Sequence, residues 1–376
     1  MNEIPVSGTP QKGNRTIRNL NLEKDFAKFE ELSVISFGEG SNPHQEMYQW
    51  LFDNNPYNPH GENLMFAMWD KDRDRMIATD GLVPMELNRR GETFFTAHSV
   101  KSMTHPDYKR QGIFRTMTEN SLQQGEKQGM DLVIGLANSN SYPAYQKFGW
   151  TTLFEREVYI LPVNITNKLK GMVKIAPLAK AGNALYQIAA KVKRGNQHAL
   201  RDIPQCTVEE YDEVPRDAAV CWEKYKEKFE YCIVRDFKYL DFRYNKRPDV
   251  RYKTLLIRSG GEPIGYAVLH QSKANGKQMI CVAENFTDPE NELYIGALAE
   301  AISAYCFRRG VDYAVVCSGG FGKFKEVFLR HGFVWQKRRN TIMVAKTFNE
   351  KLRVEDLVGA EHWHLSQGDG ESELDL

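Results

Sequence analysis

The amino-acid sequence predicts an α/β protein, with mixed sheets of the α+β kind, in which one unit of sheet and helices occurs twice. The 376 residues are enough for two domains of ordinary size, each with its own core. Strand-like and helix-like segments of the first half follow the order β-β-β-α-β-α-β. The second half repeats this order, and a shift of 183 residues places Pro106 on Pro289 and Gly149 on Gly332. These observations predict a duplicated fold.

The first copy begins with three strand-like segments separated by turn residues, which we expect to form an antiparallel meander: residues 64–70, 75–88 and 92–104. A helix, a strand, a helix and a strand follow: residues 113–127, an apolar run from Asp131, residues 141–148 and residues 150–160. The second copy has matching segments: strands at 262–271 and 277–287, a helix at 293–310, a strand at 312–318, a helix at 323–332 and a strand at 339–347.

The predicted division of the chain has four regions: a first domain over residues 1–160, a basic linker over 161–201, a second domain over 202–350 and an acidic tail over 351–376. Residues 158–201 contain no Asp or Glu but eight cations: Lys168, Lys170, Lys174, Lys180, Lys191, Lys193, Arg194 and Arg201. Apolar residues recur there at helical spacing, so residues 176–195 are typical of an amphipathic helix. We expect this helix to pack across the domain junction with a solvated cationic face. Weak peripheral contact with acidic membrane lipid, or contact with RNA, is the alternative.

Composition excludes several classes of protein. A formal net charge of +1 argues against a surface that coats nucleic acid, so no nucleic-acid partner is expected. The chain has no long apolar run and a polar N-terminus, which predicts a cytoplasmic protein with no transmembrane segment. Six cysteines without a C-x-x-C pair predict free thiols. His362 and His364 lack neighbouring ligand residues, so we expect no metal.

The stretch HPDYKRQGIFRTM, residues 105–117, has the features of an anion site at the start of a helix. The first amides of a helix have no intrahelical acceptor, and the helix dipole places partial positive charge there. Gly112 has no Cβ to keep phosphate oxygens away from these amides, and Lys109, Arg110 and Arg115 add charge around the same point. The pattern predicts a pyrophosphate cradle.

A second motif follows the strand beside this helix, with Asn138 and Tyr145 in NSNSYPAYQKFGW. Together the two motifs resemble those of the GNAT superfamily of acyl-CoA-dependent N-acetyltransferases, over residues 15–160. Its Q/R-x-x-G-x-G/A signature falls on the six residues Lys109, Arg110, Gln111, Gly112, Ile113 and Phe114. Lys109 and Phe114 depart from the family pattern, the second by replacing a small residue.

The resemblance implies that acetyl-CoA is the acyl donor and that the acetyl group passes directly to an amine in one ternary complex. Ser102, Met103 and Thr104 would run beside pantetheine, and one amide there would polarise the thioester carbonyl. Asn138 would contact the coenzyme arm. Tyr145 would protonate the departing thiolate.

The base that deprotonates the amine is left open by the sequence. His98 lies on the strand leading to the thioester, and its ordinary pKa of about 6.5 suits a base near neutrality. Glu86 and Asp80 on the neighbouring strand are rivals, and a relay through water is a further possibility.

The second copy lacks this chemistry. Glu292 stands where the first copy has Lys109, Ile295 where it has Gly112, and Phe328 where it has Tyr145. Carboxylates in its loop would repel a diphosphate, and a β-branched side chain would block the amides. We therefore expect one donor site per chain.

The acceptor is less clearly indicated. Residues 37–61 are rich in aromatic and polar side chains, and Glu39, Trp50 and Tyr57, with Glu86, would line a cleft for a polar primary amine. An amino sugar or nucleotide sugar fits these features, and a looser resemblance to polysaccharide-related tandem GNAT proteins adds Asp369 and Glu371 to the cleft. A plain surface loop is the alternative interpretation.

Two other functions fit the sequence. A Fem-like aminoacyltransferase would take its donor from aminoacyl-tRNA and use the lysine-rich linker on RNA, although the intact Gly112 cradle argues against it. A non-catalytic scaffold would bind coenzyme A without turnover. The sequence is compatible with a monomer or a homodimer.

Overall fold

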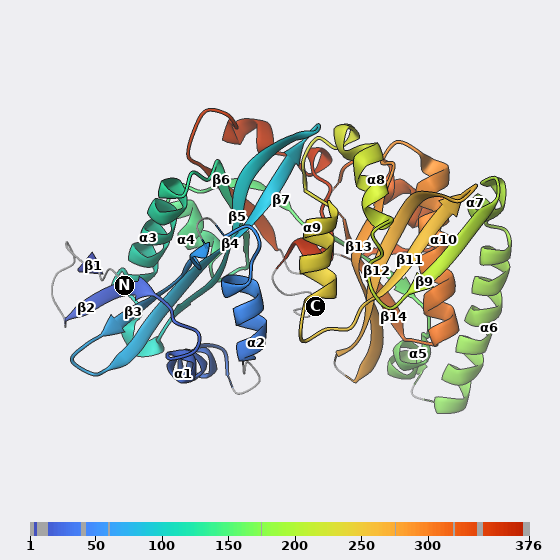
Figure 1. Cartoon of the computed structure of the whole chain (residues 1–376). Coiled ribbons are helices and arrows are strands. Elements are labelled where there is room, and N and C mark those ends of the chain that lie inside the picture. Colours follow the sequence, from blue (N-terminus) through green and yellow to red (C-terminus); the bar gives the residue numbers. More distant parts are fainter. Residues whose placement is uncertain are drawn as a thin grey trace.

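The computed structural model describes residues 4–5, 14–38, 43–58, 61–173, 175–274, 276–318, 320–336 and 341–370. The predicted acceptor residue Glu39 and the tail residue Glu371 lie outside these ranges. Two mixed sheets, each covered by helices, lie side by side (Figure 1). The predicted fold class, two units of mixed sheet and helices, is confirmed.

The first sheet belongs mostly to the N-terminal half. Its strands are hydrogen-bonded in the order β1 (Ile4–Pro5), β2 (Arg15–Asn19), β3 (Met65–Asp70), β4 (Arg75–Arg89), β5 (Glu92–Thr104), β6 (Leu132–Ala137), β16 (Ile342–Thr347) and β7 (Thr151–Glu155), with β10 (Cys232–Ile233) paired to β4. Neighbours are antiparallel except for β5 and β6, which run parallel. The predicted meander is therefore present as β3, β4 and β5.

The second sheet has the same plan. Its order is β15 (Val334–Gln336), β8 (Glu157–Pro162), β14 (Tyr313–Ser318), β13 (Lys277–Thr287), β12 (Glu262–Ala274), β11 (Lys253–Ser259) and β9 (Cys206–Tyr211). Here β13 and β14 form the parallel pair. The helices that follow the third strand of each meander are α3 (Ile113–Lys127) and α10 (Glu292–Arg309).

The two halves exchange strands, which the sequence interpretation did not anticipate. The expected single strand over residues 150–160 is two strands, because the chain leaves the first sheet at Arg156 and enters the second as β8. In return β16, from the C-terminal half, lies between β6 and β7 of the first sheet. Strand β8 of the first half lies between β15 and β14 of the second sheet, and β16 lies between β6 and β7 of the first. The boundary between the two sheets therefore does not fall at a single residue near 160.

Further helices cover the sheets and join the halves. In the first half these are α1 (Phe26–Phe37), α2 (Gln45–Tyr48), a π-helical turn (Gln49–Asp53) and α4 (Tyr142–Lys147). In the second they are α7 (Ala199–Asp202), α8 (Ala218–Tyr225), α9 (Phe237–Leu240), a π-helical turn (Asp241–Asn245) and α11 (Phe324–Arg330). Short 3-10 turns lie at Pro106–Tyr108, Lys226–Lys228, Val354–Leu357, Ala360–His362 and Gln367–Asp369. One buried core joins the two halves.

The basic linker forms a helical hairpin of α5 (Thr166–Val173) and α6 (Ala176–Gly195), so the predicted helix is present over the expected residues. Its predicted place at the domain junction is wrong. Figure 1 shows α6 on the outer side of the second domain, next to α10 and far from the first sheet. Among the described helices, none has the length and apolar composition that crossing a bilayer would require.

Candidate active site

Strands β5 and β6 stop pairing before either strand ends, and we call this fork between them, beside the start of α3, the first cleft. The two strands pair in parallel from Thr96 with Leu132 to Ser99 with Gly135, and their pairing ends there. Beyond that point β5 continues alongside β4 up to Thr104, while β6 continues alongside β16. Residues 100–104 therefore pair with β4 but not with β6. Backbone groups on their β6 side can bond an extended ligand.

A β-bulge lies in this diverging segment of β5. The register between β4 and β5 shifts near Gly81, and Lys101 has a positive φ of 55°, which is uncommon for a residue with a side chain. Ser102 donates a hydrogen bond to Asp80, and burial raises the pKa of this carboxyl to about 6. The bulge changes the direction in which the backbone N–H and C=O groups of residues 101–102 point, compared with a regular strand.

The loop after β5 leads into α3, whose N-terminus has no side-chain cap. Arg110 has a φ of 63° and Gly112, the N-cap of α3, a φ of 77°. Gly112 offers no side-chain bond to the first amides of the helix. The amides of Ile113, Phe114 and Arg115 are thus accessible to an external acceptor. This geometry fits an anion.

The cationic side chains around this helix start differ in their contacts. Lys109 and Arg110 are exposed beside it. Arg115 instead pairs with Glu119 on its own helix, with 2.7 Å between Nε and Oε1. Gln111 accepts a hydrogen bond of 2.6 Å from Arg15 of β2, so its side chain fixes the loop to the sheet. The mobile charge near the cradle therefore comes from Lys109 and Arg110.

The bulky residue in the motif has a packing role. The Phe114 ring lies 5.9 Å from that of Tyr145, edge to face, and 5.9 Å from that of Phe148, stacked. Its side chain therefore packs α3 against α4. The side chain of Ile113 is buried in the core, so this residue offers only its amide to a ligand.

Tyr145 lies at the point where the strands part. Its hydroxyl is 3.3 Å from Oγ of Ser99, the last paired residue of β5. Burial raises the pKa of Tyr145, and the nearby Asp80 acts in the same direction. The phenol thus remains protonated at neutral pH and can donate a proton.

Asn138 is exposed and shapes the turn before α4. Its side-chain oxygen accepts hydrogen bonds from the amides of Asn140 and Ser141, at 2.9 and 3.1 Å. Such a turn is a usual role for asparagine before a helix. Because the side-chain oxygen is used in this turn, the side-chain amide nitrogen is the group that could make the predicted contact with the donor.

His98 lies on the other face of β5 from Ser99, because side chains alternate along a strand. Burial lowers the pKa of His98 to about 4, with Arg156 and Arg243 acting in the same direction and Asp369 opposing them. The imidazole is therefore neutral at pH 7. It lines a small pocket of about 30 Å³ between the halves, whose other walls are Leu51, Tyr57, Val83, Pro84, Met85, Tyr239, Phe242, Arg243, Gly368, Asp369 and Gly370.

The predicted acceptor residues separate in the structure. Tyr57 lines the pocket, and the ammonium of Lys238 lies 3.7 Å from its ring centre. Trp50 instead packs between the halves, with its Nε1 donating to the carbonyl of Phe242 at 2.9 Å. Glu86 is half-buried on β4, where burial raises its pKa. Of these three, Tyr57 alone is among the pocket walls.

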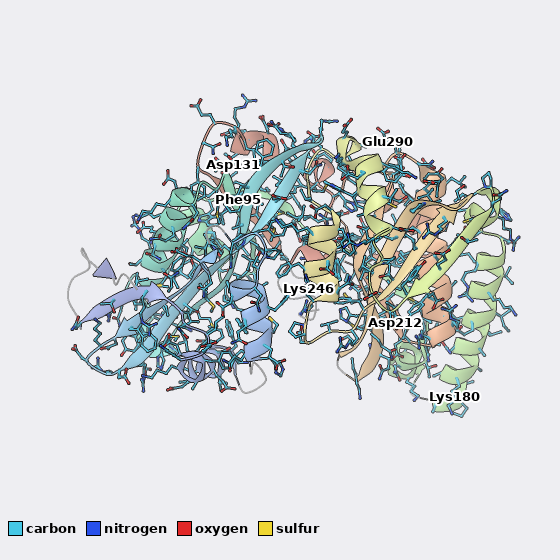
Figure 2. All side chains as sticks on the ribbon, viewed as in Figure 1. Phe95, Asp131, Lys180, Asp212, Lys246 and Glu290 are labelled. Carbon is cyan, nitrogen blue, oxygen red and sulfur yellow. The ribbon has the colours of Figure 1, made fainter. Side chains whose placement is uncertain are left out.

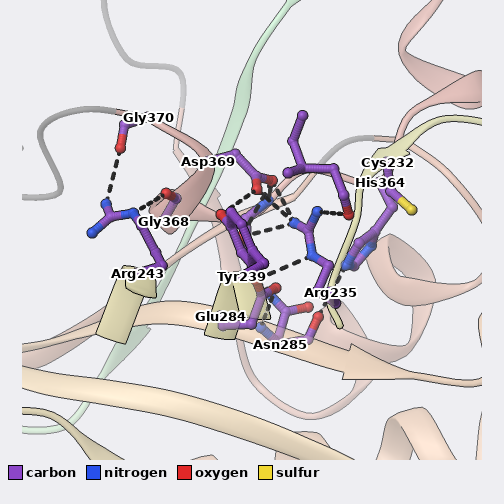
Figure 3. Close-up of polar contacts among 12 residues, drawn as sticks. Cys232, Arg235, Tyr239, Arg243, Glu284, Asn285, His364, Gly368, Asp369 and Gly370 are labelled. Carbon is purple, nitrogen blue, oxygen red and sulfur yellow. Dashed lines mark hydrogen bonds and ion pairs between the residues drawn. The ribbon is translucent and has the colours of Figure 1, made fainter. Parts of the chain in front are cut away.

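The pocket also contains residues that sequence reasoning missed, from the second domain and the tail. Arg243 donates to the carbonyls of Gly368 and Gly370, at 2.7 and 3.0 Å (Figure 3). Beside it Arg235 is fully buried between two carboxylates, 3.2 Å from Glu284 and 2.6 Å from Asp369. Burial raises the pKa of Glu284 to about 7. Asp369 was already predicted for the cleft from the sequence, and its stretch GDGE, residues 368–371, also contains Gly368 and Gly370.

A second cleft exists in the other copy. There β13 and β14 pair in parallel from Met279 with Tyr313 to Val282 with Val316, and β13 carries a bulge at the matching place. The helix after it is capped: Asn291 accepts hydrogen bonds from the amides of Leu293 and Tyr294, at 3.1 and 3.2 Å. These amides are therefore not available to a ligand.

The tail of the chain fills this second cleft. A ring nitrogen of His364 lies 3.0 Å from the carbonyl of Asn285, and Gln367 contacts the thiol of Cys317 on β14. A Cβ on Gly368 would come within 2.9 Å of the carbonyl of Ala283, so the backbones touch there. The second copy holds part of its own chain where the first has an open edge.

Residues 16–153 match the family model of the acetyltransferase (GNAT) domain. This match assigns residues 16–153 to the GNAT superfamily. No curated protein matches the chain by sequence. Among solved structures, the GNAT fold recurs over most of the chain in proteins of low sequence identity, so these likenesses concern the fold.

Three of these structures match the chain over both of its halves. A protein of Enterococcus faecalis V583 described as a probable N-acyltransferase has a TM-score of 0.60 at 13% identity, covering 89% of this chain and 73% of its own. A GCN5-related N-acetyltransferase of Anabaena variabilis has a TM-score of 0.59 at 12% identity, with the same coverage. The N-myristoyltransferase of Saccharomyces cerevisiae, with bound myristoyl-CoA, has a TM-score of 0.60 at 10% identity, covering 91% of this chain and 84% of its own.

Proposed function

We propose that this protein is an N-acetyltransferase that uses acetyl-CoA to acetylate the primary amine of a small polar acceptor, such as an amino sugar or a nucleotide sugar. The GNAT domain supports acyl transfer in general. The observation that carries the proposal is the open N-terminus of α3, whose N-cap is a left-handed glycine without a side-chain cap, beside the part of β5 that no longer pairs with β6.

Gly112 and the amides that follow it would hold the pyrophosphate of the donor, with Lys109 and Arg110 adding charge. Residues 100–104, which continue beyond the pairing of β5 with β6, would bond the pantetheine arm through backbone groups. Bound acetyl-CoA supplies an activated thioester. The bulge at Lys101 would direct an amide of β5 toward the thioester oxygen, where such a donor stabilises developing negative charge.

Proton transfers would occur on the two faces of β5. Tyr145, protonated and 3.3 Å from Ser99, would donate a proton to the departing sulfur. The acceptor would approach through the pocket on the opposite face, where the neutral His98 can accept a hydrogen bond. Asp80 contacts Ser102 and is close to Tyr145, which favours a place on the donor side for this rival base.

The walls of the pocket support a small acceptor with both apolar and polar parts. Tyr57 and Phe242 supply aromatic walls against which a sugar ring could pack, and His98 supplies a polar group. Direct transfer requires both substrates at once, and His98 of the pocket is adjacent in sequence to Ser99, which contacts Tyr145 on the donor side.

A Gly112→Asp variant tests the donor site. The added carboxylate would face the first amides of α3 and repel the diphosphate, so the affinity for acetyl-CoA should fall by at least about tenfold. Isothermal titration calorimetry measures this change. Gly276→Asp is the matched control, because Gly276 has nearly the same φ, 76°, and a Cβ added there would meet nothing within 4 Å. Equal affinity of both variants and the unmodified protein would contradict the proposal.

The alternative of an aminoacyl-tRNA donor finds less support. Helix α6, which carries many of the linker cations, lies on the outer side of the second domain, away from the first sheet (Figure 1). A thermal unfolding scan separates the two donors: acetyl-CoA at 100 times its Kd should stabilise the protein by roughly 2.7 kcal/mol. An enzyme that uses aminoacyl-tRNA would show no such shift.

A further inference from the structure

Helix α6 packs against the second domain through its polar face. Tyr186 donates a hydrogen bond of 2.6 Å to the carbonyl of Pro162, and Asn183 accepts one of 2.8 Å from the amide of Ile165. Arg194 lies with its guanidinium carbon 3.4 Å from the ring centre of Phe307 on α10. An amphipathic helix of a soluble domain normally turns its apolar face to the core, so this orientation is inverted.

The apolar face of α6 points outward instead. Leu178, Leu185, Ile188 and Val192 are spaced by 7, 3 and 4 residues, which places them on one stripe of the helix. Each of these four side chains is between 55% and 69% exposed. Met172 of α5 and Ile175 between the helices are exposed as well. We call these six residues the α6 stripe.

Cations border the stripe. At 100° per residue, Lys180 and Lys191 lie next to one side of the stripe. Both are exposed. Figure 2 shows Lys180 at the outer margin of the molecule. Since residues 158–201 contain no Asp or Glu, no acid of this segment offsets that charge.

We propose that the hairpin of α5 and α6 binds to the surface of a bilayer that contains anionic lipids. The stripe would enter the boundary between headgroups and acyl chains, and the bordering lysines would extend to the lipid phosphates. A large apolar face bordered by lysines is typical of helices that lie in a membrane interface. This inference goes beyond the proposed acetyl transfer and does not depend on it.

Other partners fit this face less well. A second copy of the chain, joined through a twofold axis, would bring two sets of lysines together across the contact. Nucleic acid would satisfy the lysines but leave the leucine and isoleucine side chains in water. An anionic bilayer satisfies both the apolar stripe and its charged border.

Sedimentation with sucrose-loaded vesicles tests the proposal, using the full chain with phosphatidylcholine alone or mixed with phosphatidylglycerol. The protein should sediment with the mixed vesicles, and added salt should weaken its binding. Leu185→Glu combined with Ile188→Glu should lower the partition coefficient by at least about tenfold, since each apolar side chain leaves the interface. Ile35→Glu is the matched control, because Ile35 is also an exposed helical isoleucine, on α1. Its binding should equal that of the unmodified protein.

The contribution of charge is measured separately with Lys180→Gln combined with Lys191→Gln. One lysine near an anionic surface contributes about 1 kcal/mol, so the double variant should bind roughly 30-fold more weakly to mixed vesicles. Circular dichroism would verify that both double variants remain folded, which the exposure of all four residues favours.

Three results would overturn the proposal. The first is equal binding of the control and the stripe variant. The second is a lipid-free dimer that the stripe variant dissociates, which would assign the stripe to a second copy. The third is binding of poly(U) by the unmodified protein and the stripe variant alike while neither sediments with vesicles, which would assign the face to nucleic acid.

Discussion

The two clefts of this protein share a scaffold and differ in what lies inside them. Both occur where a parallel strand pair ends after four matched residues, and both lie beside a bulged strand. The first leads to a helix whose N-cap is Gly112, without a side-chain cap. The second leads to a helix capped by Asn291, and the tail fills it. The same scaffold thus presents an uncapped helix N-terminus in one half and a capped helix beside a tail-filled cleft in the other.

The filled second cleft contains a buried ionic cluster of Arg235, Glu284 and Asp369. Arg235→Met should cause the largest loss of stability among the variants considered. The substitution leaves Glu284 and Asp369 buried without their cation, which typically costs about 3 to 5 kcal/mol. Urea unfolding followed by fluorescence measures the loss. Arg353→Met is the control, because Arg353 pairs with Asp356 at the surface and should change stability by less than about 1 kcal/mol. Similar losses in both variants would contradict the assigned role of the buried cluster.

The open cleft should be sensitive to chemistry instead of packing. Tyr145→Phe retains the ring contacts with Phe114 and Trp150 but removes the proton donor, so kcat should fall by about 100-fold with little change in acetyl-CoA affinity. Steady-state kinetics with an accepted amine measures this. Tyr142→Phe, which removes another hydroxyl from the same helix, should leave kcat within about twofold. A Tyr145→Phe enzyme with unchanged kcat would assign the proton to another donor.

A comparison of the buried histidines predicts a dependence of stability on pH. The folded-state pKa of His98 is about 4, below the value of about 6.5 in the unfolded chain, so the unfolded state binds more protons between these pH values. Stability therefore falls as pH falls through this window. Between pH 7.5 and pH 5, His98 should lower the free energy of unfolding by about 2 kcal/mol. Urea unfolding at the two pH values measures this change, and the His98→Gln variant should lack it.

His364 in the second cleft should behave in the same way down to lower pH, since its pKa is lowered to about 3 by burial first and by Arg235 next. His364→Gln is thus the second arm of that experiment. If neither substitution flattened the fall in stability between pH 7.5 and pH 5, the two imidazoles would not be buried and neutral as described.

The smallest effect concerns the cap. Asn291→Ala should cost about 1 kcal/mol of stability, because two amides of α10 lose their acceptor. It should not create a coenzyme site, since Glu292 and Ile295 remain and the tail fills the cleft. Calorimetry in a Gly112→Asp background tests this. Recovery of acetyl-CoA binding in the double variant would mean that the cap alone distinguishes the two clefts.

The sequence interpretation succeeded where neighbouring residues determine the structure. The strand, loop and helix around Gly112, the helix over residues 176–195 and the shift that relates the two copies depend on patterns within short windows. It was incomplete where a distant segment takes part. Trp50 was expected in the acceptor cleft but packs against Phe242, 192 residues away in the chain. Arg243 and Tyr239 were not among the predicted site residues, although both line the pocket.

The sequence by itself determined the fold class, the duplication, and which copy has a glycine at the start of its helix, because periodicity and residue size act locally. Only the tertiary structure decided that β8 and β16 change sheets, that the tail enters the second cleft, and that α6 turns its apolar stripe outward. A strand edge or a helix face can be covered by any segment of suitable shape. Which segment covers it depends on how all parts of the chain pack together in the folded state, and no short stretch of sequence contains that information.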